Sequence, residues 1–148
     1  NIITPNQFEF ELLTGSKLGS VDEAVRVARQ LRGRGPDVVV ITSLATPDIP
    51  ADQLCTLAVN GEGAWLVNTP RLALHPLPNG MGDVFSATLL ARLLSGHALP
   101  QALELATATL YALVQETSEG SRDLPLVRAQ EQIVEPAQRY SASEVVSQ

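Results

Sequence analysis

The chain has 148 residues, of which 45% are hydrophobic and 18% charged, and its formal net charge at pH 7 is −6. This is the composition of one globular domain, and it excludes a disordered or collagen-like chain. The acidic balance argues against binding of nucleic acid, and no apolar run reaches the roughly 18 residues of a membrane span.

The first part of the chain carries signals for alternating strands and helices. Gly15 marks the end of a short helix, and the spacing of Ser20 and Glu23 is that of a capping box at the start of a longer one. In chain order, the predicted elements are a strand ending at residues 2–3, a helix over 6–13, a helix from the cap at 20 to 33, and a buried strand over 37–41.

The second part of the chain begins with a predicted hairpin, whose turn is Asn60-Gly61-Glu62-Gly63. The predicted elements are strands over 54–59 and 64–67, a helix from 80 to about 95, a helix from 100 to near 120, and an amphipathic segment over roughly 126–134. The polar tail is expected to be frayed. This order predicts an α/β fold with a mainly parallel central sheet.

The segment Gly80-Met81-Gly82-Asp83 is the strongest candidate for a functional site. Its glycines allow a tight turn close to a ligand, and it opens an apolar helix that we expect to be buried. The free N–H groups and the dipole of that helix would bind an anion. Asp83 is unfavourable there for anion binding alone, so we interpret it as a base that deprotonates an attacking hydroxyl. The alternative is that Asp83 only caps the helix.

Asn6 and Glu9 have the N-x-x-E spacing, at the carboxyl end of the first predicted strand. In a functional interpretation, Glu9 holds Mg²⁺ through water and Asn6 lies near a triphosphate. The same spacing is that of a helix capping box. The two interpretations are compatible, because ligands of open α/β sheets collect at the carboxyl ends of strands.

Thr42 and Ser43 follow the buried strand and are placed to contact a phosphate or a monovalent cation. The alternative is an ordinary strand end with satisfied hydroxyl groups. The single cysteine, Cys55, is predicted to be an inert core thiol. Because one cysteine excludes an intramolecular disulfide framework, a reducing, cytoplasmic location is expected.

Taken in order, these segments resemble the ribokinase-like superfamily of small-molecule kinases and, within it, the pyridoxal kinase family. The resemblance rests on ITPNQFE from Ile3, continuing as ELLTG from Glu11, on GPDVVVITS from Gly35, and on GMGDVF from Gly80. The G-x-G-D segment is shared with sugar kinases, whereas TPNQFE is more specific. The similarity covers the C-terminal half of the family, so residues 1–148 are expected to form the C-terminal half of a single three-layer α/β/α kinase domain.

The resemblance implies ATP-dependent phosphorylation of the 5′-hydroxymethyl group of pyridoxal, pyridoxine or pyridoxamine, the B6 vitamers. Asp83 would be the base, and the backbone of Gly80, Met81 and Gly82 would form the anion hole for the γ-phosphate. Mg²⁺ would be held by Glu9 through water, and a monovalent cation, K⁺ or Na⁺, by Thr4 and Thr42. The residues implied to bind ATP are Asn6, Thr42, Ser43, Leu74, His75 and Pro76. The intact protein is expected to be a homodimer.

The sequence departs from the family pattern at Met81, where the family more often has a small residue or threonine. A backbone N–H survives that change, but a hydroxyl contact to phosphate is lost. The loop at residues 76–79 is also richer in proline than expected. The resemblance places the pyridoxal pocket and lid in the N-terminal half, so this chain alone is expected to be inactive.

Two alternative functions remain open. One is another ribokinase-like kinase, acting on hydroxymethylpyrimidine or a sugar, although pyrimidine kinases of this superfamily carry a cysteine in place of Asp83. The other is a non-catalytic nucleotide-binding module, which Met81 and the altered loop favour. Phosphorylation of pyridoxal would distinguish the first interpretation from both.

Overall fold

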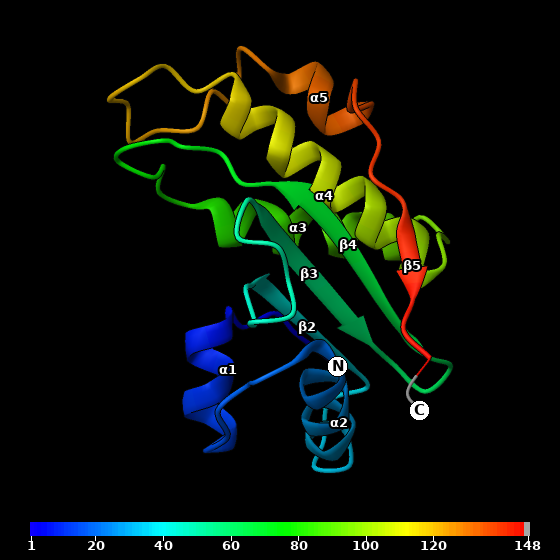
Figure 1. Ribbon diagram of the computed structural model, residues 1–148. Helices are drawn as coiled ribbons and strands as arrows, with labels where there is room; N and C mark the ends of the chain where they lie inside the picture. Colours follow the sequence, from blue (N-terminus) through cyan, green and yellow to red (C-terminus); the bar gives the residue numbers. More distant parts are fainter. Residues whose placement is uncertain (147–148) are drawn as a thin grey trace. The chain divides into compact units, whose positions relative to one another are not determined.

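The computed structural model describes residues 1–146, and the chain divides into two compact units (Figure 1). The first unit contains residues 1–70 and the C-terminal segment from Ala142, and the second contains residues 71–141. Among the described residues, no helix combines the length and the apolar character that a membrane crossing requires.

The first unit is built on a five-stranded sheet in the order β1-β2-β3-β4-β5. Its strands are β1 (Ile2–Ile3), β2 (Val38–Leu44), β3 (Gln53–Val59), β4 (Ala64–Pro70) and β5 (Ala142–Glu144). Only β1 and β2 pair in parallel, and the other three neighbouring pairs are antiparallel. The expectation of a mainly parallel sheet is therefore wrong. A parallel crossover needs about a dozen residues or more, and the connections at 45–52 and 60–63 are too short for one.

Strand β5 lies in the tail that was expected to be frayed, and that expectation is wrong for residues 142–146; residues 147–148 lie outside the described part of the chain. The strand pairs antiparallel with β4, and the Val145 N–H group donates to the Ala64 carbonyl at 2.8 Å. The Val145 side chain packs against the core of the unit. Backbone pairing and one apolar contact thus order a segment whose local sequence is polar.

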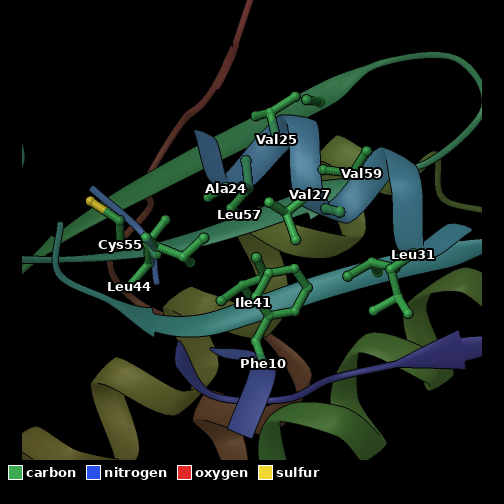
Figure 2. Close-up of a cluster of buried hydrophobic side chains, with 14 of the residues drawn as sticks. Phe10, Ala24, Val25, Val27, Leu31, Ile41, Leu44, Cys55, Leu57 and Val59 are labelled. Atoms are coloured by element: carbon green, nitrogen blue, oxygen red, sulfur yellow. The ribbon is translucent and has the colours of Figure 1, made fainter. Parts of the chain in front are cut away.

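Helices α1 (Gln7–Thr14) and α2 (Val21–Arg32) pack against the sheet of the first unit. Figure 2 shows this core, to which Phe10 contributes from α1 and Val25 and Leu31 from α2. The capping box at Ser20 is confirmed in part, since its side chain accepts the Glu23 N–H group at 3.1 Å. The core holds α1 beside β2, and that packing positions the residues at the end of β1.

The second unit contains helices α3 (Met81–Leu94), α4 (Leu99–Gln115) and α5 (Gln130–Val134). Both later helices are shorter than predicted: α4 ends before residue 120, and the segment at 126–134 is helical only in its last part. The Arg92 guanidinium donates to the carbonyls of Ile133 and Val134, at 2.8 and 2.7 Å. Arg92 therefore ties α3 to the carboxyl end of α5, where orphan carbonyls need donors.

Helix α3 is less buried than its apolar sequence indicated. Phe85 and Leu89 are buried, but Leu90 and Leu94 are 48% and 80% exposed. The expectation that α3 is buried on nearly all sides is wrong for this chain. Helix α4 is the more deeply buried helix, with Leu103 and Leu113 fully enclosed.

Candidate functional site

The predicted residues of the first unit meet at the carboxyl ends of β1 and β2. The Thr42 N–H group donates to the Pro5 carbonyl at 2.9 Å, and Asn6 and Thr42 form an isolated parallel bridge. Thr4 is half-buried in the short segment between β1 and α1. The structure thus brings Asn6 and Thr42 together, as expected for polar residues that follow neighbouring parallel strands, and Thr4 lies two residues before Asn6.

Ser43 occupies a β-bulge that the sequence analysis missed. Between the pairs Ile41–Leu57 and Leu44–Cys55, β2 contains one residue more than β3. Ser43 has φ 54°, in the left-handed region that non-glycine residues rarely adopt. The bulge keeps Leu44 on the buried face and leaves Ser43 exposed. The sequence carried a signal for this bulge: two polar residues stand between the apolar Ile41 and Leu44, where strict alternation allows one.

The capping interpretation of Asn6 and Glu9 is confirmed. The Asn6 side-chain oxygen accepts the Glu9 N–H group, and Glu9 Oε2 accepts the Asn6 N–H group, both at 2.9 Å. This cap leaves Asn6 Nδ2 and Glu9 Oε1 available, and the Glu9 side chain is exposed. No group of three or more acidic, histidine or cysteine side chains suited to a metal occurs within residues 1–146. Mg²⁺ held by Glu9 through water would therefore take its direct ligands from water and phosphate.

A hydrogen-bond network between α1 and the segments beside it was also missed by the sequence analysis. Gln7 Oε1 accepts the Ala45 N–H group at 2.9 Å, while Gln7 Nε2 donates to Glu11 Oε1 at 3.0 Å. Glu11 further accepts from Lys17 Nζ at 2.7 Å and from the Leu18 N–H group at 3.1 Å. The hydrogen bonds from Lys17, Gln7 and Leu18 lower the pKa of Glu11 to about 2. The network joins α1 to the residues that follow β2.

The predicted residues of the second unit lie at the start of α3. Gly80 is the N-cap, with φ 77°, and no side chain caps the helix. The alternative in which Asp83 is the helix cap is therefore wrong. Asp83 is exposed, and its carboxylate makes no hydrogen bond or ion pair with any residue from 1 to 146. Because the first N–H groups of a helix lack carbonyl partners within it, those of Met81, Gly82 and Asp83 remain open to a ligand.

The two glycines at this helix start have different functions in the fold. Gly80 needs its positive φ, which strains other residues. Gly82 is helical, and a Cβ atom there would meet nothing within 4 Å. Its lack of a side chain is therefore not required by packing. The Asn79 N–H group donates to the Arg122 carbonyl at 2.8 Å, which anchors the chain just before the turn.

The loop before that turn contains the other residues implied to bind ATP. Leu74 and Pro76 are half-buried, and His75 is exposed. All three belong to the second unit, whereas Asn6, Thr42 and Ser43 belong to the first.

Cys55 is buried, and its Sγ atom lies 3.0 Å from Asn68 Oδ1. Burial raises the pKa of this thiol to about 11, with a smaller contribution from the negative charge of Asp48. The thiol is thus protonated at neutral pH and poorly nucleophilic, which confirms the prediction of an inert core cysteine.

Comparison with known proteins gives consistent matches over nearly the whole chain. A model of the phosphomethylpyrimidine kinase family matches residues 1–126. The chain is 43% identical to a pyridoxal kinase of Deinococcus radiodurans, over 98% of this chain and 50% of that protein. It therefore spans about half the length of the curated relatives it matches.

Solved structures match as well. One is a putative phosphomethylpyrimidine kinase from Bacteroides thetaiotaomicron, in a crystal form with pyridoxal; it is 29% identical with a TM-score of 0.80, over 97% of this chain and 52% of that one. Another is the pyridoxal kinase of Trypanosoma brucei, which is 27% identical with a TM-score of 0.84, over 97% of this chain and 51% of that one. The fold is therefore similar to that of solved structures named as phosphomethylpyrimidine and pyridoxal kinases.

Proposed function

The chain belongs to the phosphomethylpyrimidine kinase family, and on that premise we propose that it is the C-terminal half of an ATP-dependent pyridoxal kinase. The complete kinase, meaning this chain with the N-terminal half that its relatives contain, would transfer the γ-phosphoryl group of ATP to the 5′-hydroxymethyl group of a B6 vitamer. The 43% identity to a pyridoxal kinase over 98% of the chain supports this substrate class.

The observation that carries the proposal is the uncapped start of α3. An open carboxylate at Asp83 stands there beside free backbone N–H groups, with Gly80 and Gly82 opening the turn. Phosphoryl transfer needs a positioned base and donors for the charge on the phosphoryl oxygens. This helix start supplies both, and no hydrogen bond within the described residues competes for the carboxylate.

In the proposed reaction, Asp83 accepts the proton of the substrate hydroxyl. The hydroxyl oxygen then bonds to the γ-phosphorus, the bond from that phosphorus to the bridging oxygen breaks, and ADP leaves. The N–H groups of Gly80, Met81 and Gly82 form the anion hole for the transferring group. A backbone donor works whatever the side chain is, so methionine at position 81 is compatible with this role.

The remaining roles are assigned by the resemblance and by the chemistry of each group. Asn6, Thr42 and Ser43 would contact the phosphates of ATP, and Leu74, His75 and Pro76 would line the nucleotide site. Mg²⁺, held by Glu9 through water, would neutralise charge on the phosphates. A monovalent cation, K⁺ or Na⁺, would lie at Thr4 and Thr42. The complete kinase would be a cytoplasmic homodimer with a three-layer α/β/α domain.

The family description favours a second candidate, a kinase that phosphorylates hydroxymethylpyrimidine. The Bacteroides thetaiotaomicron protein carries such a name and was crystallised with pyridoxal, so the name of a relative does not by itself decide the substrate. The carboxylate at Asp83 favours pyridoxal as the substrate. The resemblance to the ribokinase-like superfamily implies that a pyrimidine kinase would have cysteine at this position.

A substrate panel tests the proposal. The complete kinase would be supplied with ATP, Mg²⁺ and, in separate reactions, pyridoxal, pyridoxine, pyridoxamine, hydroxymethylpyrimidine and ribose, and ADP release would be measured. We expect the highest kcat/KM with a B6 vitamer. Preference for the pyrimidine or the sugar would contradict the proposed substrate. ATP binding without transfer to any of them would identify a non-catalytic nucleotide-binding module.

A further inference from the structure

Ser43 is held in an unfavourable backbone conformation by anchors on both of its sides. On one side, the Thr42 N–H group donates to the Pro5 carbonyl at 2.9 Å. On the other side, the Leu44 side chain is fully buried, and the Ala45 N–H group donates to Gln7 Oε1 at 2.9 Å. A strained conformation persists only where the surroundings fix it, so each anchor contributes to the position of Thr42 and Ser43.

Of the three anchors just named, only the Gln7 side chain comes from a helix. Its amide has a donor end and an acceptor end, and only one orientation satisfies both neighbours. Glu11, when ionised, accepts hydrogen bonds but cannot donate them, so Gln7 Nε2 must point to Glu11 and Oε1 to the Ala45 N–H group. Lys17 and the Leu18 N–H group hold the Glu11 carboxylate in turn.

We propose that Gln7 is a positioning residue, which uses Glu11 to fix its amide and thereby holds the Thr42–Ser43 bulge in the conformation that binds nucleotide. The proposal rests on the proposed function, in which Thr42 and Ser43 contact the phosphates of ATP. Gln7 itself touches no substrate. Since Gln7 adjoins Asn6 in the helix cap, the same residue also fixes the bulge relative to the cap of α1.

Three variants of the complete kinase test this mechanism. Gln7→Leu keeps the size of the side chain but loses both hydrogen bonds, and Gln7→Glu places a carboxylate against Glu11. In the double variant Gln7→Glu/Glu11→Gln, the new carboxylate at position 7 can accept from both the Ala45 N–H group and the new amide at position 11. The exchange is incomplete, because the Leu18 N–H group, which bonds to the same Glu11 oxygen as Gln7, loses its acceptor. Gln30→Leu, at an exposed site on α2, is the matched control.

We expect Gln7→Leu and Gln7→Glu to raise the KM for ATP by roughly fivefold or more, as the loss of one or two hydrogen bonds predicts. The KM for pyridoxal should stay within about twofold, because the bulge is assigned to the nucleotide. The double variant should have a lower KM for ATP than Gln7→Glu, a rescue that is partial because the Leu18 N–H group loses its acceptor. Gln30→Leu should leave the KM for ATP unchanged. A general loss of folding would instead lower kcat without a selective rise in the KM for ATP, and the exchange would not rescue it.

Hydrogen exchange of the Ala45 amide separates this proposal from the proposed function, because it needs no turnover. Its protection should fall in Gln7→Leu and should be higher in the double variant than in Gln7→Leu, even if the wild-type protein phosphorylates none of the tested substrates. Unchanged protection in Gln7→Leu would overturn the proposal. A KM for ATP unaffected in an active Gln7→Leu kinase, or a properly folded double variant that shows no rescue, would overturn it as well.

Discussion

Two carboxylates on α1 have different surroundings, and these predict different roles. Glu9 is exposed, and the only hydrogen bond that its carboxylate accepts within residues 1–146 comes from the Asn6 N–H group of the cap. Glu11 is half-buried and accepts hydrogen bonds from Gln7, Lys17 and the Leu18 N–H group. Glu9 therefore has acceptor capacity left for a hydrated metal ion, whereas Glu11 is committed to the fold.

Substitution of Glu9 separates its structural role from its proposed metal role. Gln at the third helical position completes a capping box as Glu does, so Glu9→Gln should keep the stability of α1. The Mg²⁺ concentration for half-maximal activity of the complete kinase should rise roughly tenfold. Glu9→Ala, the comparison variant, should also lose about 1 kcal/mol of unfolding free energy. If Mg²⁺ titrations of Glu9→Gln and wild type coincide, Glu9 serves only as a cap.

Glu11 should make the stability of the fold depend on acidic pH. Its pKa is about 2 in the folded state against an ordinary 4.5, so its stabilising effect is present above the ordinary value and is lost as pH falls toward 2. In urea unfolding at about pH 7 and about pH 3, the wild type should lose more stability than Glu11→Gln. Equal losses in the two proteins would show that the Lys17 and Gln7 contacts do not stabilise the ionised carboxylate.

At the scale of elements, local sequence signals predicted the parts that depend on local structure. The caps at Asn6 and Ser20 and the strands before and after the Asn60–Gly63 turn were identified because each pattern is complete within a few residues. The parallel-sheet prediction was wrong because strand direction depends on the length of the connections as well as on apolar runs. Strand β5 was missed because its pairing with β4 joins residues far apart in the sequence.

The candidate site was predictable to a similar degree. The start of α3 and the junction of Asn6 with Thr42 follow from glycine spacing and from strand ends. The link from Gln7 to Ala45 was not predictable, because it is a side-chain contact between residues whose proximity only the fold creates. The exposure of Leu94 was likewise not visible, since an apolar sequence does not specify what covers each face of a helix.

The start of α3 can be tested as an element with Gly82→Ala. A Cβ atom at Gly82 would meet nothing within 4 Å, and alanine favours the helix by about 1 kcal/mol over glycine. The unfolding free energy should therefore stay the same or rise. Phosphoryl transfer should nevertheless fall, because the methyl group occupies space over the N–H groups assigned to the γ-phosphate. Full activity in a stable Gly82→Ala kinase would contradict an anion hole at this turn.

At the scale of the whole molecule, the net charge of −6 and the single lysine, Lys17, limit how the chain can bind ATP. Lys17 is already paired with Glu11. None of the residues assigned to the proposed site is a lysine or an arginine. Charge on the phosphates would then be met there by backbone dipoles, by Mg²⁺ and by groups other than these residues. The chain also spans about half the length of its curated relatives.

It follows that the 148-residue chain on its own should not phosphorylate pyridoxal, whereas the complete kinase should. The comparison requires both proteins at equal concentration with ATP and Mg²⁺, and a folded chain verified by circular dichroism. Turnover by the isolated chain at a rate near that of the complete kinase would show that the vitamin pocket lies within these residues.

The most direct test of the account is the rate of ADP release with pyridoxal for the complete kinase and its Asp83→Asn variant. Asparagine keeps the size and polarity of the side chain but cannot accept the hydroxyl proton as a carboxylate does. The account predicts a fall in kcat on the order of 10²- to 10⁴-fold, with the KM for ATP little changed. A kcat for Asp83→Asn within a few-fold of wild type would show that Asp83 is not the base.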